Sequence, residues 1–129
     1  MASTSTSLGL SYQMKDGELT YNITCNFQKT KSWGLMKTDY ILAHEQGHFD
    51  ITELCARRLY QELAGHQFER RTFKAELTRM YNDIVAQKEA MQNTYDNETD
   101  HSRNRKVQAE WMTRIEQELE ATQGYAAYP

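Results

Sequence analysis

The chain has 129 residues, of which 39% are hydrophobic and 26% charged, and its formal net charge is −3. This length suits one domain with a single hydrophobic core, and we expect that domain to span residues 1–129, with a disordered or artificial start at 1–6 and a tail at 124–129. The absence of a strongly basic surface argues against nucleic-acid binding. No apolar run reaches the roughly 18–20 residues that cross a bilayer. The first residues are small and polar, without the basic start and apolar centre of a signal peptide.

The N-terminal region carries the pattern of a β-hairpin. Residues 7–13 and 18–28 are predicted strands, the second of which is rich in Thr, Tyr, Ile and Phe, and Asp16-Gly17 lies between them. Asp-Gly favours a tight hairpin turn, because Gly tolerates positive φ. Apolar and polar residues alternate in the second segment, which predicts one buried and one exposed face. The predicted buried set is Leu19, Tyr21, Ile23, Cys25 and Phe27. Residues 29–37 are predicted to form a connecting loop.

Cys25 and Cys55 are the only cysteines in the chain. They either form one disulfide in an oxidising compartment or remain two buried thiols. We favour free, packed thiols. Metal ligation by either cysteine is disfavoured, because neither has a Cys or His neighbour at the usual spacing.

Three helices are predicted after the hairpin, from apolar residues that recur every three or four positions. The first begins after the N-cap Thr38 and ends near Gly65. The second covers about residues 69–94 and the third about residues 103–121, with a polar turn at 95–102 between them. The sequence therefore predicts an α+β fold that is mainly helical, with an N-terminal β-hairpin followed by three helices.

The first predicted helix contains His44-Glu45-Gln46-Gly47-His48. His44 and His48 lie one helical turn apart and about 40° apart around the axis, so their imidazoles can bind the same Zn²⁺. The adjacent Glu45 can reach a water molecule at that metal and act as a general base. This arrangement predicts metal-assisted hydrolysis, most often of a peptide bond. The alternatives are a chance match on a solvated helix face, or His48 as a hydrogen-bonded core residue.

A stable site needs a third protein ligand. Glu53 lies on the opposite side of the helix from His44, roughly 180° around the axis, and His66 lies about 27 Å along the axis from His48. The remaining histidine, His101, lies in the predicted polar turn, which can fold back over the first helix, and we nominate it. An ordinary exposed turn residue is the alternative for His101. Carboxylates of the same turn or of the second helix compete with it: Asp96, Glu98, Asp100, Glu76 and Glu89.

Two motifs of this chain resemble a bacterial family that is widespread in Bacteroidetes and described as predicted secreted zinc-dependent proteases. The first motif comprises Lys31-Ser32-Trp33, residues 38–51, Glu53 and Ala56-Arg57. The second comprises Tyr95-Asp96, Glu98-Thr99 and His101, with Trp111 following, where the family pattern reads Tyr-Asp … Thr-x-His-Gly. Ser102 stands where that pattern has Gly. The resemblance extends over nearly the whole chain.

The resemblance implies zinc as the cofactor, with His44, His48 and His101 as ligands and Glu45 as the catalytic carboxylate. It further implies a minimal zincin-like metallopeptidase that acts on a peptide or protein, in the cell envelope or outside the cell, although the export signal of such a protein is not visible in this chain. Tyr95 is a candidate to stabilise the oxyanion. Neither nucleic-acid binding nor membrane insertion is expected, and the sequence leaves the oligomeric state open. The alternative functions are a non-catalytic, zinc-stabilised binding domain of the cell envelope and a hydrolase of other amides.

Overall fold

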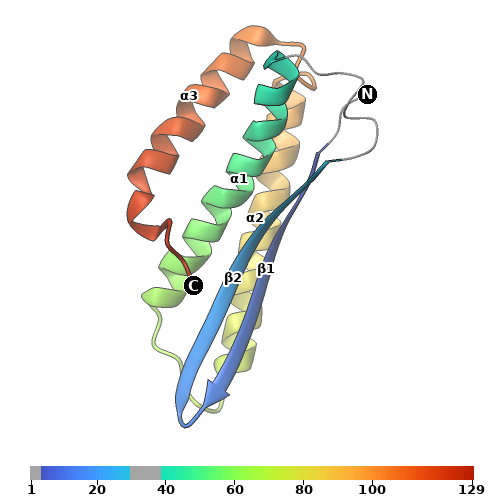
Figure 1. Ribbon diagram of the computed structural model, residues 1–129. Helices are drawn as coiled ribbons and strands as arrows, with labels where there is room; N and C mark the ends of the chain where they lie inside the picture. Colours follow the sequence, from blue (N-terminus) through green and yellow to red (C-terminus); the bar gives the residue numbers. More distant parts are fainter. Residues whose placement is uncertain (1–3, 30–38) are drawn as a thin grey trace.

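A computed structural model describes residues 4–29 and 39–129. The elements are β1 (Thr4–Lys15), β2 (Glu18–Lys29), α1 (Asp39–Ala64), α2 (Phe73–Glu98), α3 (Arg105–Ala121) and the short 3₁₀ helix η2 (Gln123–Tyr125). Figure 1 shows three long helices alongside one another, with the hairpin lying along α1 and α2 and with α3 on the other side of α1. The predicted α+β fold, a β-hairpin followed by three helices, is confirmed.

The hairpin is antiparallel and paired over its whole length, from Thr4 opposite Lys29 to Lys15 opposite Glu18. Its turn has φ 53° at Asp16 and 81° at Gly17, the two positive values that a type I′ turn requires, so the prediction of an Asp-Gly turn is confirmed. The predicted alternation is also found. Ile23 is buried, and Leu19, Tyr21 and Cys25 pack partly buried on the same face, while the side chain of Phe27 is outside the described part of the chain.

The helices follow the predicted order, with one shift that affects the candidate site. The predicted loop at 29–37 and the N-cap Thr38 lie outside the described residues, except for Lys29, which ends β2. Helix α2 begins and ends about four residues later than predicted, at Phe73 and Glu98. Its last turn therefore includes Tyr95 and Asp96, which the polarity of the segment had placed in a turn. The side chain of Tyr95 is fully buried, and this packing keeps the segment helical.

Two groups of buried side chains hold the elements together, and α1 contributes to both. The hairpin core joins the hairpin to α1 and α2 through Leu8, Ile23, Cys55, Ala56, Leu59, Leu63, Phe73, Leu77, Met80 and Ile84. The α3 core joins α1, α2 and α3 through Ile51, Leu54, Tyr95, Trp111 and Ile115. Burial of such apolar surface is the main stabilising contribution to the fold.

Cys25 and Cys55 are both free thiols, which is the alternative that the sequence favoured. Cys55 is fully buried in the hairpin core, and Cys25 packs partly buried against it. Burial raises the pKa of Cys25 to about 11. At neutral pH the thiol is therefore protonated and a poor nucleophile.

The C-terminal residues, predicted as a tail, return to the hairpin. The carbonyl oxygen of Pro129 accepts a hydrogen bond from the backbone N–H of Ile23 at 2.7 Å, and the hydroxyl of Tyr128 donates to Glu53 at 2.7 Å. This contact covers part of the outer edge of β2.

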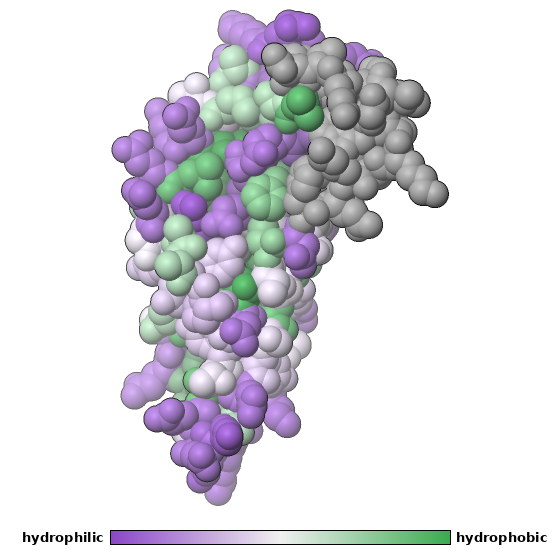
Figure 2. All heavy atoms as spheres, viewed as in Figure 1, coloured by the Kyte–Doolittle hydropathy of each residue, from purple (hydrophilic) through white to green (hydrophobic). Residues whose placement is uncertain are grey.

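The hydropathy of the surface changes along the length of the molecule. In Figure 2, weakly polar atoms cover much of the middle of the visible face, where the hairpin runs, and strongly hydrophilic atoms gather at the lower end beside the hairpin turn. None of the helices that the structure describes has the length and apolar character needed to cross a membrane.

Candidate metal centre

The motif histidines lie on the side of α1 that faces α2 and α3. The apolar residues one and two turns further along that side, Ile51 and Leu54, pack into the α3 core and fix the orientation of the helix. His44 is 4% exposed and Glu45 8% exposed, while His48 is half-buried. The two imidazole rings lie 5.1 Å apart, centroid to centroid, and perpendicular to each other. The prediction that both rings share one side of a helix is confirmed.

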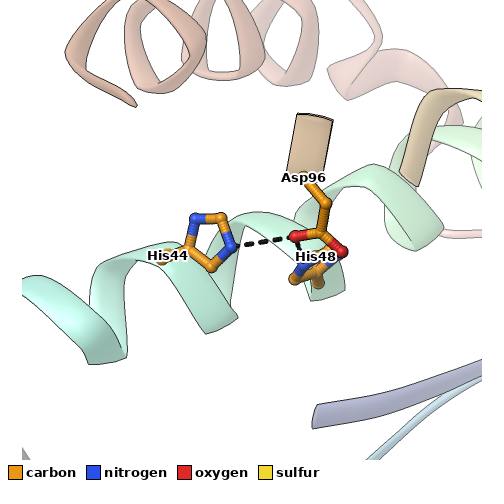
Figure 3. A group of neighbouring side chains, drawn as sticks. All are labelled: His44, His48 and Asp96. Atoms are coloured by element: carbon orange, nitrogen blue, oxygen red, sulfur yellow. Dashed lines mark hydrogen bonds and ion pairs between the residues drawn. The ribbon is translucent and has the colours of Figure 1, made fainter. Parts of the chain in front are cut away.

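Asp96, on the last turn of α2, lies between the two rings (Figure 3). Its Oδ1 atom is 2.8 Å from Nε2 of His48 and 3.1 Å from Nε2 of His44. Each of the three side chains offers one ligand atom, and these atoms lie within 4.8 Å of one another. The described residues thus form a three-membered group suited to hold a metal ion.

His101, which we nominated as the third ligand, is not part of this group. It lies in the turn after α2 with φ 51° and an exposed side chain, and its backbone N–H donates to the carbonyl oxygen of Asp96 at 2.8 Å. The difference follows from the length of α2. Because the helix continues to Glu98, it turns the carboxylate of Asp96 toward α1, and His101 comes after the helix has ended.

The other acidic competitors on α2 contact different partners. Glu98 accepts a hydrogen bond from the indole N–H of Trp111 at 2.9 Å. Glu76 pairs with His66 at 3.3 Å, and Glu89 pairs with Lys88 at 3.1 Å. Of the carboxylates weighed from the sequence, Asp96 is the one that joins the histidines.

Two glutamines contact the outer nitrogens of the histidine rings. Nδ1 of His44 lies 2.7 Å from Oε1 of Gln108 on α3, and Nδ1 of His48 lies 2.5 Å from Oε1 of Gln92 on α2. Sequence reasoning missed both residues. The signal for Gln92 was its position one turn before Asp96, on the same side of α2. No local signal exists for Gln108, because only the packing of α3 buries it.

Tyr95 lies beneath the site rather than in it. Its ring stacks on His44 with centroids 4.6 Å apart, and its hydroxyl donates to the carbonyl oxygen of His44 at 2.8 Å while accepting from Gln108 at 2.9 Å. Burial raises its pKa well above the ordinary value. The side chain is 0% exposed and its proton is already engaged, so this structure does not support the oxyanion role suggested for Tyr95.

The donor chemistry of the group fits a cation. An amide oxygen only accepts hydrogen bonds, so the network assigns a proton to Nδ1 of both histidines and directs both Nε2 atoms at the Asp96 carboxylate. Burial by itself would lower the pKa of His48 and raise that of Asp96. The hydrogen bonds between them outweigh it, raising the pKa of His48 and lowering that of Asp96. A divalent ion would take the place of the protons between Nε2 and Asp96, and the lone pairs of two neutral imidazoles and one carboxylate oxygen would then bind it.

The spacing and the residue types also suit zinc. The 2.8 and 3.1 Å separations are close to the ~3.3 Å between two ligands of a tetrahedral zinc ion with bonds of about 2.0–2.1 Å. Two histidines and one carboxylate are a ligand set found in catalytic zinc sites.

Comparison with known proteins identifies the family to which the chain belongs. Residues 2–102 match a family described as "Bacterial protein of unknown function (DUF922)". The matched region includes the hairpin, α1, α2 and all three members of the metal-binding group, and it ends before α3. Neither the curated proteins nor the solved structures yield a match.

Proposed function

The chain belongs to the DUF922 family of bacterial proteins, and we propose that it is a zinc-dependent metallopeptidase. The observation that carries this proposal is the convergence of His44, His48 and Asp96 on one point, together with the buried Glu45, whose charge acts on His48. In this proposal the three converging side chains are the zinc ligands. His101, expected from the family resemblance to be the third, is replaced by Asp96.

The number of donors favours a catalytic rather than a structural ion. Structural zinc sites are closed by four protein ligands, whereas catalytic sites use three and keep one position for water or substrate. Within the described residues the group has three members. The side chain of Asp96 is 32% exposed, so solvent can reach the site on that side.

The proposed mechanism assigns the proton transfers to Glu45. When bound, zinc supplies a Lewis acid and lowers the pKa of its water. Glu45 is close enough for its charge to contribute to the raised pKa of both His48 and Tyr95. Its carboxylate accepts the proton of the attacking water and passes it to the leaving amine. Asp96 would neutralise part of the positive charge of the ion, and the two imidazoles would bind it in their neutral form.

Replacing Glu45 tests the catalytic role. Glu45→Gln keeps the size of the side chain but removes its basicity, so we expect one zinc ion per chain and peptide hydrolysis reduced by about 10²–10⁴-fold. Elemental analysis gives the metal content, and mass spectrometry of a digested peptide library gives the cleavage rate. Unchanged turnover would exclude Glu45 as the base. Wild-type protein that is full of zinc but cleaves no peptide would point to a zinc-stabilised binding domain.

A pair of variants tests the identity of the third ligand. Asp96→Ala should lose zinc during dialysis, whereas His101→Ala, in the exposed turn, should retain it. The opposite result would restore His101 as the ligand.

The family resemblance also leads us to propose that the protein is exported to the cell envelope or beyond, which fractionation of the native bacterium tests.

A further inference from the structure

We infer that Gln92 and Gln108 are positioning residues that hold the two histidines in the tautomer that presents Nε2 to a metal ion. The inference rests on the metal ligands of the proposed function and is independent of peptide hydrolysis. It follows from the way in which each amide is itself held.

Gln92 binds both the backbone and the side chain of His48. Its amide nitrogen donates to the carbonyl oxygen of His48 at 2.8 Å and to Oγ1 of Thr52 at 3.0 Å, while its Oε1 faces Nδ1 of His48 at 2.5 Å. Turning the amide around would set its oxygen against the carbonyl oxygen of His48, with two acceptors in contact. The amide is therefore fixed with its oxygen toward the ring.

Gln108 holds His44 in the same way, except that the hydroxyl of Tyr95 lies between the amide nitrogen and the carbonyl oxygen of His44. Its amide nitrogen donates to the hydroxyl of Tyr95 at 2.9 Å, and that hydroxyl donates to the carbonyl oxygen of His44 at 2.8 Å. Its Oε1 accepts from Nδ1 of His44 at 2.7 Å. Each histidine is thus enclosed in a loop of hydrogen bonds that runs from its own carbonyl oxygen to its own ring nitrogen.

The consequence for metal binding follows from the single ring proton of a neutral imidazole. When the proton is held on Nδ1, Nε2 carries a free lone pair and faces Asp96. Water is a poor substitute for the acceptor at His44, because Gln108 is only 2% exposed. A carboxylate often performs this role in other metal sites, and its loss typically weakens metal binding by about 10–100-fold. Glutamine provides the acceptor without adding negative charge beside Asp96.

Zinc affinity tests the inference. Gln92→Met and Gln108→Met keep the approximate length of the side chain and remove the acceptor, and we expect each to weaken zinc binding by about 10–100-fold in competition with a chelating dye. The matched controls are Gln87→Met on α2 and Gln117→Met on α3, both at exposed positions, and they should bind zinc as the wild type does. Gln108→Glu restores an acceptor for Nδ1 of His44, but its second oxygen competes with the carbonyl oxygen of His44 for the one hydroxyl proton of Tyr95, so it should recover part of the affinity.

A spectroscopic readout separates positioning from a packing defect. In zinc-loaded protein, long-range ¹H–¹⁵N spectra should show a slowly exchanging Nδ1 proton on both histidines. Gln92→Met should remove only the His48 signal and Gln108→Met only the His44 signal. Variants that bind zinc like the wild type and keep both signals would overturn the inference while leaving the ligands in place. Wild-type protein that binds no zinc would overturn the proposed function as well.

Discussion

Gly47 lies between the two motif histidines because α1, α2 and α3 approach closely there. A β-carbon at this position would overlap the hydroxyl of Tyr95 and would lie 2.7 Å from Cζ of that ring and 2.8 Å from Cε of Met112. Glycine inside a helix is normally about 1 kcal/mol less favourable than alanine. Here the close approach outweighs this preference, because neither the ring nor the helix backbone can move without disturbing His44.

We therefore expect Gly47→Ala to lower the free energy of unfolding by about 1–3 kcal/mol, the usual effect of overpacking, despite the better helix propensity of alanine. Urea unfolding followed by circular dichroism measures this change. The control is Gly124→Ala, where an added β-carbon meets no atom within 4 Å and the change should stay within about 0.5 kcal/mol. A Gly47→Ala protein as stable as the wild type would show that the helices separate easily at the site.

The members of the site differ in how far the sequence could predict them. The spacing of His44 and His48 fixes their relation on any helix, so this pair was predictable. The third member was not, because Asp96 reaches the pair only if α2 extends past it, and that extension depends on the burial of Tyr95. The contact of Gln108 with His44 joins residues 64 positions apart in the sequence, and no local sequence pattern predicts such a contact.

The turn between α2 and α3 contains an unusual run of backbone conformations. Asp100, His101 and Ser102 have φ values of 50°, 51° and 79°, in the left-handed region. A residue with a β-carbon in this region costs about 1–2 kcal/mol relative to the right-handed one. The side chain of Asn104 then caps α3 by accepting from the N–H of Val107 at 3.2 Å. The polar composition predicted a chain reversal correctly, but the reversal itself begins only after Glu98.

Ser102→Gly should raise the free energy of unfolding by about 1 kcal/mol, because glycine adopts positive φ without a steric penalty. This is also the residue that the resembling family pattern carries at the position. Thermal and urea unfolding would measure the gain. The same replacement at Ser11, on the exposed face of β1 and outside the set of positive-φ residues, should instead destabilise the protein. A loss of stability at Ser102 would mean that its side-chain contacts outweigh the strain.

At the scale of the whole molecule, the candidate site joins all three long helices. His44 and His48 come from α1, Gln92 and Asp96 from α2, and Gln108 from α3. The hairpin packs against the opposite end of this arrangement through a separate core. A bound ion would therefore act as a cross-link between α1 and α2, supported by α3.

Zinc should consequently stabilise the fold. A ligand present at 100 times its dissociation constant adds about 2.7 kcal/mol to the free energy of unfolding, which corresponds to an increase of roughly 10 °C in Tm for a domain of this size. Differential scanning calorimetry with zinc and with a chelator would measure the difference. Asp96→Ala should abolish the increase, since it removes the ligand contributed by α2. An equal Tm under both conditions in the wild type would contradict the proposed site.

The position of Gln108 on the last long helix also sets an order of events during synthesis. A nascent chain that has emerged from the ribosome only as far as residue 102 already contains the three proposed ligands but not α3. His44 then lacks its amide acceptor, and Tyr95 lacks the indole ring of Trp111 that lies 5.3 Å from it. The hydrogen-bonded surroundings of His44 and Tyr95 are therefore complete only after translation has passed α3.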